Sequence, residues 1–340
     1  MSVKSRIKKV LPISVFERLK RVVNGSLALY GMTIAQAHRY SKAYAKYDSK
    51  DVHQIAARLI FFTHQIEKGL SHSDFRYGFG RKPLQYLKHS MERYQRADAG
   101  YATSTVYQSA LAALHEYAMR HEDHAEEFAF AKSLFPESVW EAAAQVSANR
   151  GGSIAITAKS KLHNKNLPFS ELSKNRHSIR EYDESAVSLE EIEPAIELAM
   201  RTPSVCNRQP SRVKVILDPE RIAKALYIQG GFRGYVTPPA LILITADNRS
   251  FMTPQEHNEG YTDGGLFGMS LLLALEEQGL AACPLNTMFR PNAEKKTRKL
   301  LNIPDYENLV MYISVGHFLE STKTCCSKRL SVSEIINIIQ

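Results

Sequence analysis

Hydrophobic positions follow one pattern before residue 150 and another after residue 173. In the first part, Ala, Leu, Tyr, Glu and Arg recur at spacings of three and four, and Pro occurs between residues 26 and 150 only at Pro83 and Pro136. This spacing predicts helices. We expect an all-α N-terminal domain over 1–150, with helices at 26–47, 50–69, 83–98, 102–120, 122–133 and around 137–147.

After residue 173, short apolar runs alternate with helical patterns. The run ALILITA at 240–246 predicts a fully buried strand, 309–315 predicts another buried strand, and 213–217 is a strand candidate. Helices are predicted over 219–229 and over the long apolar stretch 263–279, which we expect to be buried. The Gly-rich and polar segment 151–172 reads as a linker, so the predicted organisation is a helical domain, a linker and a mixed domain over 173–340.

Composition narrows the function only slightly. With 340 residues, 44% hydrophobic and 23% charged residues, the chain is typical of a globular protein. The net charge of +9 suits an anionic cofactor or an acidic surface, and the chain lacks the motifs of a nucleic-acid-binding protein, the weakest of three function hypotheses. Its four cysteines show no CxxC spacing, so no zinc site is predicted and a reducing, cytoplasmic location is expected.

The stretch 175–210 carries the clearest chemistry. Arg176, Ser178 and Arg180 alternate along the chain, so an extended conformation would place all three on one side. Two guanidinium groups and a hydroxyl are typical of a phosphate site. A helix follows, for which Ser188 and Glu191 predict a capping box.

Several motifs in this order resemble the nitroreductase family of FMN-dependent oxidoreductases. The Arg-x-Ser-x-Arg segment at 176–180 is followed by the turn Pro203-Ser204-x-x-Asn207-x-Gln209-Pro210. The apolar helix 263–279 and the strand Pro284-Leu285-Asn286-Thr287 come next, and the basic pair Lys328-Arg329 lies near the end. The resemblance extends over about 173–340 and leaves the first half of the chain without a counterpart.

The resemblance implies a fold, a cofactor and an assembly. The fold would be α+β, with a mixed or antiparallel central sheet flanked by helices, and the cofactor FMN, reduced transiently by NADH or NADPH. Members are homodimers, so helix 263–279 and the tail 330–340 would lie at the subunit interface, with Ser204 and Asn207 reaching the partner's flavin. The residues implied to bind FMN are Arg176, His177, Ser178, Arg180, Pro203, Ser204, Asn207, Gln209, Arg233, Pro284, Leu285, Asn286, Thr287, Lys328 and Arg329.

The chemistry implied is a ping-pong hydride transfer through flavin N5 to a small organic acceptor. The backbone amides of Asn286 and Thr287 would lie near N5, and no catalytic side chain is required. The main alternative is a non-catalytic flavin-binding accessory protein whose helical domain binds a partner or a membrane surface.

Two basic segments of the helical half have open interpretations. In 64–82, His64 and Lys68 share one helical face, and Gly78 and Gly80 follow among cationic residues. This segment is either a substrate-anion pocket over the flavin, with His64 in it, or a helix end whose cations complement the dipole. Residues 1–25 are either an amphipathic helix on an anionic membrane or a docking helix with a solvated basic face.

Overall fold

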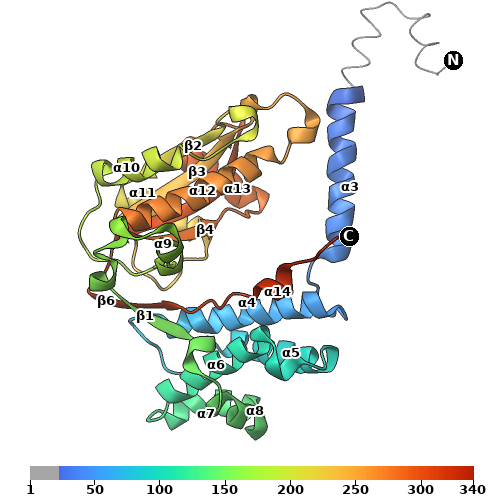
Figure 1. Ribbon diagram of the computed structural model, residues 1–340, viewed down its shortest axis with the longest axis vertical. Coiled ribbons are helices and arrows are strands. Elements are labelled where there is room, and N and C mark those ends of the chain that lie inside the picture. The colour runs from blue at the N-terminus through green and yellow to red at the C-terminus, as the bar shows by residue number, and fades with distance from the viewer. Residues whose placement is uncertain (1–22) are drawn as a thin grey trace, which may run out of the picture.

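The computed structural model describes residues 23–340, and Figure 1 shows their arrangement. Most of the predicted basic helix at 1–25 lies outside the described residues. Among the helices that are described, none is both long and apolar enough to span a membrane.

The N-terminal part is all helical, as predicted. Its helices are α3 (Ala28–Ala43), α4 (Val52–Leu70), α5 (Arg81–Ala97), α6 (Thr105–Arg120), α7 (Ala125–Leu134) and α8 (Glu137–Ala144). From α4 to α8 they enclose one hydrophobic core, in which Leu59, Leu84 and Leu114 are fully buried. Helix α3 stands apart from this bundle along one side of the molecule (Figure 1). It ends before the predicted residue 47, because Tyr44 adopts an extended backbone.

The second part is built on a four-stranded antiparallel sheet in the order β2-β3-β5-β4. The strands are β2 (Ser211–Ile216), β3 (Ala240–Asp247), β4 (Leu280–Asn286) and β5 (Glu307–His317). Helices α10 (Leu189–Ala199) and α12 (Glu259–Glu277) cover one face, and α11 (Pro219–Gln229) and α13 (Pro291–Leu301) lie on the other. Both faces of β3 are therefore buried, which explains its continuous apolar run. This is the predicted α+β architecture.

Two pairs of residues explain where α10 begins and how closely α12 packs on the sheet. The capping box predicted at the start of α10 is present, with both Ser188 and Glu191 in their reciprocal hydrogen bonds. In α12, a Cβ at Gly264 would lie 2.6 Å from Val310, and one at Gly268 would lie 2.6 Å from Met311. The small residues of α12 thus allow it to approach β5 of its own sheet closely.

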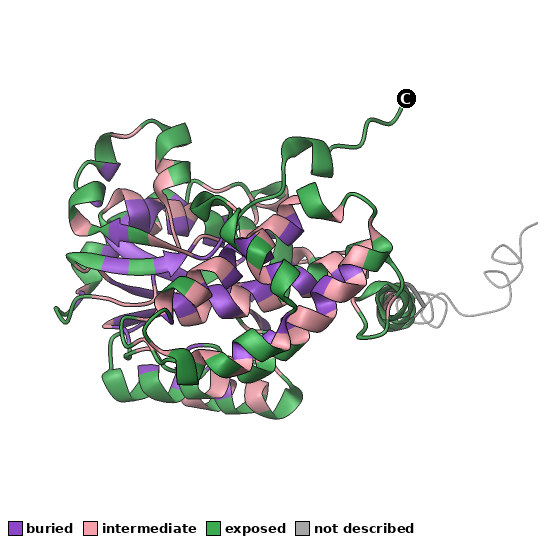
Figure 2. Ribbon diagram, turned by 90° about the horizontal axis from the view of Figure 1, so that it is seen from below, coloured by how far each residue is buried: buried purple, intermediate pink, exposed green. Residues whose placement is uncertain are grey.

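Helix α12 is more exposed than predicted on the side turned away from the sheet. Tyr261, Leu266 and Met269 are 51%, 49% and 43% exposed. The expectation of burial on nearly all faces was therefore wrong within this chain, because the sheet covers only one side of the helix. Figure 2 shows the mixture of buried and exposed residues along such surface helices.

A second, two-stranded sheet lies between the two parts of the molecule. Strand β1 (Ser153–Thr157) pairs antiparallel with β6 (Ser321–Cys325), and both strands contact α4. Strand β1 falls within the segment predicted as a linker, and α9 (Phe169–Asn175) follows it. The last helix, α14 (Val332–Ile335), returns to the helical part, where Thr105 Oγ1 donates a hydrogen bond to Glu334.

Candidate functional site

The segment 176–180 lies along the free edge of the four-stranded sheet. Ser178 forms a parallel bridge with Ala282 of β4, the edge strand, and the Ile179 amide donates to the Ala282 carbonyl at 3.0 Å. Ile179 is fully buried. Alternation along an extended segment then places Arg176, Ser178 and Arg180 on the side opposite Ile179, as predicted.

A buried polar network anchors the start of this segment. Lys161 Nζ lies 2.7 Å from a carboxylate oxygen of Glu276, and both side chains are 2% exposed. Asn164 donates to the same carboxylate at 3.0 Å, and Asn175 donates to Asn164 Oδ1 at 2.5 Å. Lys161 also donates to the Asn175 carbonyl. The segment before Arg176 is thus tied to the C-terminal end of α12, so it does more than connect two domains.

Arg176 is a buried cation that lacks partners of its own. Its Nε and Nη1 atoms are buried and make no hydrogen bond among the described residues. Glu276, its nearby acid, is already bonded to Lys161 and Asn164. Burial lowers the pKa of Arg176, and this effect outweighs the opposing influence of the Glu276 charge, while the nearby Arg329 lowers the pKa further. Such a group fits an absent anion, since buried charges are normally paired.

Arg180 is the second buried cation of the segment. Its Nη1 donates to the Ser178 carbonyl at 3.3 Å and lies 3.7 Å from Cys325 Sγ. Its other close electrostatic neighbours are Cys283, Tyr182 and Tyr235. In the part of the chain that the structure describes, Arg180 has no carboxylate within ion-pairing distance, so it too could hold a negatively charged or strongly polar ligand.

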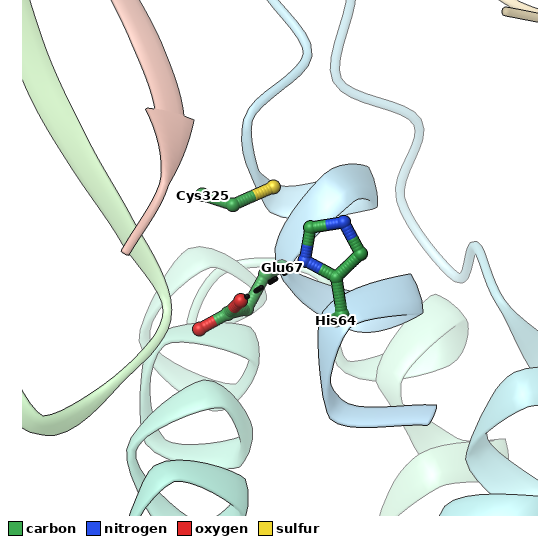
Figure 3. A group of neighbouring side chains, drawn as sticks. All are labelled: His64, Glu67 and Cys325. Carbon is green, nitrogen blue, oxygen red and sulfur yellow. Dashed lines mark ion pairs between the residues drawn. The ribbon is translucent and has the colours of Figure 1, made fainter. Parts of the chain in front are cut away.

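Figure 3 shows a cluster of His64, Glu67 and Cys325. Arg180 lies next to this cluster, with its Nη1 3.7 Å from Cys325 Sγ. His64 Nδ1 lies 3.5 Å from Glu67 Oε2, and donor atoms of all three residues lie within 4.8 Å of one another. Hydrogen bonding to Cys325 and then to Glu67 raises the pKa of His64 to about 9. The donors suit a metal ion in type, but the Arg180 guanidinium next to Cys325 would repel a divalent cation. Sequence reasoning missed Cys325, because it comes from β6 at the other end of the chain.

The segment 64–82 divides into two groups of cations. Lys68 donates to the Gly231 carbonyl at 3.0 Å, and a cleft next to it is also lined by Arg76 and Arg233. Arg81 instead lies over the ring of Phe130, 5.0 Å from its centroid, on the helical side. Lys68 and Arg76 therefore face the sheet domain, whereas Arg81 packs within the helical part.

The turn at 203–210 lies at the opposite end of α12 from Arg176. The Val205 amide donates to Asp263 at 3.2 Å, and Ser204 Oγ accepts from the Gln209 amide at 2.9 Å. Asp263 and Glu276 are separated by about 20 Å along a helix that rises 1.5 Å per residue. One chain therefore does not bring this turn to the Arg176 site.

The remaining predicted site residues lie on the edge strand and in the C-terminal segment. Pro284, Leu285 and Asn286 continue β4 beyond Ala282, and Pro284 and Asn286 are exposed. Lys328 and Arg329 line a cavity of about 130 Å³ together with His64 and Glu67. His177 lies beside Arg176, and its Nδ1 is 2.7 Å from the Asn175 carbonyl.

Comparisons with known proteins assign the second half of the chain. The model of the Nitroreductase family matches residues 173–229 and 233–317. A protein of Archaeoglobus fulgidus named "Putative NADH dehydrogenase/NAD(P)H nitroreductase" is 31% identical over 147 residues, which are 42% of this chain and 80% of that protein. The "FMN reductase [NAD(P)H]" of Bacillus subtilis is 26% identical, and the match covers 42% of this chain and 63% of that protein.

A solved nitroreductase family protein of Clostridium difficile 630 is 24% identical, with a TM-score of 0.41 over 50% of this chain and 98% of that one. The family assignment rests on the sequence matches. The chain is a member of the nitroreductase family, an oxidoreductase family, as its motifs predicted. The match begins at residue 173, so the helical half is additional to the shared part.

Proposed function

We propose that this protein is an FMN-dependent NAD(P)H oxidoreductase that reduces a small organic acceptor. The observation that carries the proposal is Arg176, a buried guanidinium with two unpartnered nitrogens on the same side of the segment as Ser178 and Arg180. A phosphate would supply the missing acceptors. The names of the two relatives, an NAD(P)H nitroreductase and an FMN reductase, support the same chemistry.

The proposed contacts with FMN are distributed along the edge of the sheet. Arg176 and Ser178 hold the phosphate, with Arg329, an electrostatic neighbour of Arg176, and Lys328 next to it in the chain. Arg180, farther along the same edge, donates to the polar rim of the ring, and the backbone of Asn286 and Thr287 approaches it from the end of β4. Bound FMN supplies the hydride transfer, and the protein supplies position and electrostatics.

The reaction takes two electrons from NAD(P)H in one half and passes them to the acceptor in the other. For a nitroaromatic acceptor the balanced step is ArNO₂ + NAD(P)H + H⁺ → ArNO + NAD(P)⁺ + H₂O. Quinones, enones and free flavin are other acceptors of the same kind. The cytoplasm supplies both reduced nicotinamide nucleotides and is the proposed location.

The proposed assembly is a homodimer that completes the site. The turn with Ser204, Asn207 and Gln209 is too far from Arg176 within one chain, whereas a second copy could supply it. The exposed apolar residues Leu266 and Met269 of α12 and Ile338 and Ile339 of the tail provide surface for such an interface.

The cofactor and the reaction are tested on the purified full-length protein. Heat-released supernatant is expected to show a flavin spectrum and to co-elute with FMN, and the protein is expected to oxidise NADH or NADPH in the presence of a quinone. Release of FAD, or failure to bind any flavin after reconstitution, would contradict the cofactor. Stoichiometric FMN without NAD(P)H oxidation would favour the accessory protein instead.

A further inference from the structure

A polar cleft lies where the helical half meets the sheet half. Its volume is about 500 Å³, and it is lined by Gln65, Lys68, Gly69, His72, Asp74, Arg76, Phe79, Arg233 and Gly234. The first seven belong to the end of α4 and the loop after it, and the last two to the loop after α11. The cleft is thus shared by the family domain and the part of the chain that precedes it.

Positive charge dominates this cleft. Lys68, Arg76 and Arg233 line it, whereas Asp74 is its single lining carboxylate. Glu181 lies behind His72 at 3.9 Å, but one of its oxygens accepts two hydrogen bonds from Ser73, both 2.9 Å long. Its other oxygen accepts from Thr322 at 3.3 Å. These bonds hold Glu181 beside His72, and no ion pair joins it to Lys68 among the described residues.

Lys68 is the innermost of these cations, and among the described residues it forms no ion pair with a carboxylate. Its Nζ donates to the Gly231 carbonyl and lies 5.9 Å from the centroid of Tyr235. Burial lowers the pKa of Lys68, and the positive charge of Arg180 lowers it further. An anion bound in the cleft would relieve both effects, because it would replace lost hydration and offset the repulsion.

The walls of the cleft are fixed by contacts across the two halves. The rings of His72 and Tyr235 stack at 3.9 Å, and Tyr235 donates to the Lys68 carbonyl at 3.4 Å. Burial lowers the pKa of His72, so at neutral pH its ring is an uncharged hydrogen-bonding group. Lys68 is consequently held in place before any ligand arrives, which reduces the entropy lost on binding.

We propose that this cleft binds a carboxylate or phosphate group of the electron acceptor, with Lys68 at its base and Arg76 and Arg233 at its mouth. The proposal rests on the proposed function, and it names the acceptor as an anionic organic molecule. Arg180 connects the two sites, because it lies in the FMN segment and is an electrostatic neighbour of Lys68 and His72. An acceptor anchored here would extend from the cleft toward that segment.

The division of the chain favours the acceptor over the nicotinamide nucleotide as the source of the anion. The use of NAD(P)H is proposed from the half that matches the family, which begins at residue 173. Lys68 and Arg76 come from the added half. Residues outside the part shared with the family are expected to contact the substrate that is particular to this protein. We take that substrate to be the acceptor.

The test uses the FMN-loaded protein and two matched probes, 4-nitrobenzoate and its uncharged analogue 4-nitrobenzamide. We expect kcat/KM to favour the carboxylate by about tenfold or more, the scale of one charge-assisted hydrogen bond. Lys68→Gln and Arg76→Gln should each lower kcat/KM for 4-nitrobenzoate by about tenfold and change that for 4-nitrobenzamide by less than about threefold.

Two variants of the same chemistry serve as controls. Lys82→Gln and Arg81→Gln remove cations from the same segment, but Lys82 lies beside Tyr86 and Arg81 lies over Phe130, outside the cleft. Neither should alter the preference for the carboxylate. Arg76 is exposed, so its variant should fold even if Lys68→Gln does not.

Three results would overturn the proposal. Equal kcat/KM for the two probes in the wild type would do so, as would equal losses for both probes in the variants. A loss confined to kcat/KM for NADPH, with NADH unaffected, would assign the cleft to the nucleotide's 2′-phosphate instead. Calorimetric titration with 4-nitrobenzoate needs no turnover, so tight binding that depends on Lys68 would support the cleft even if the proposed reaction failed.

Discussion

Lys161 and the pair Arg176 and Arg180 lie close together in the fold, since Lys161 bonds to the Asn175 carbonyl, and they differ in how their charge is balanced. Lys161 has Glu276 at 2.7 Å, with Asn164 completing the carboxylate's hydrogen bonds. Arg176 and Arg180 lie on the adjacent strand segment, and in the described part of the molecule neither forms an ion pair with a carboxylate of its own. The neighbours of Arg180 are a backbone carbonyl, thiols and tyrosines, and the acid near Arg176, Glu276, is already bonded to Lys161.

The difference suggests a criterion by which a structural cation is distinguished from one proposed to bind a ligand. A fully bonded buried pair holds its surroundings in one arrangement, and removal of one partner leaves an uncompensated charge. An unpaired buried cation already carries the unfavourable free energy of an uncompensated charge in the free protein, and an anion that binds removes it. Stability should therefore depend on the first group and ligand affinity on the second.

The largest expected effect is on the paired group. Glu276→Gln keeps the shape of the side chain but leaves Lys161 buried without a counter-charge, so the free energy of unfolding should fall by about 3–5 kcal/mol. Urea unfolding followed by circular dichroism measures it. Glu171→Gln breaks the exposed pair with Lys174 and should cost less than about 1 kcal/mol. Equal losses in the free energy of unfolding for the two substitutions would show that the buried pair contributes no more to stability than the exposed one.

Arg176→Met should affect ligand binding and spare stability. FMN affinity is expected to fall by roughly 1.5–3 kcal/mol, about 10- to 150-fold in Kd, because a charge-assisted hydrogen bond is lost. The FMN-free protein should be as stable as the wild type or more so, since an unpaired buried charge disappears. Fluorescence titration gives Kd and thermal unfolding gives stability. A loss of stability like that of Glu276→Gln would make Arg176 a structural residue.

Disrupting the proposed dimer tests whether a second copy of the chain is needed to complete the FMN site. Met269→Glu places a charge on the exposed apolar side of α12 and should raise the dimer dissociation constant by about tenfold or more, with FMN lost in parallel. Met119→Glu, on the exposed surface of α6, is the control. Light scattering gives the oligomeric state. A monomer that retains FMN would show that a single chain forms the complete site.

The smallest effect concerns His64, which has Glu67 and Cys325 as partners and the Arg180 charge nearby. The pKa of His64 is raised from 6.5 to about 9 in the folded protein. The contribution of its pairing to the stability of the fold is therefore fully present below pH 6.5 and is lost as the pH rises through about 9. The His64→Gln protein should thus melt below the wild type at pH 6 and together with it near pH 10. The difference should stay within about 1 kcal/mol, since the side chain is 35% exposed. A gap that widens with pH would contradict the assignment.

Local patterns predicted most of the elements. Helix spacing located the six helices of α3–α8 to within a few residues, because amphipathic periodicity and caps such as Asp51 are encoded locally. The continuous apolar run of β3 was equally clear. Strands β1 and β6 were missed, because each is five residues long and is stabilised by a partner at the other end of the chain.

The site was predictable only in part, for the same reason. Arg176, Ser178 and Arg180 are close in sequence, so their common side followed from strand geometry. Arg233 was predicted to bind FMN, and its place in the cleft with Lys68 and Arg76 depends on packing between the two halves of the chain. Cys325 could not be placed next to His64 without knowledge of how β6 crosses α4.

The sequence by itself determined the family and most of the elements, and it placed Arg176, Ser178 and Arg180 on one side of an extended segment, since each depends on spacing along a short stretch of chain. Only the tertiary structure decided which cations are paired. Lys161 and Arg176 are equally basic residues in the sequence, and the folding of α12 gives the Glu276 carboxylate to the lysine and leaves the arginine without one. The physical reason is that burial and pairing are properties of long-range packing, which local residue patterns do not encode.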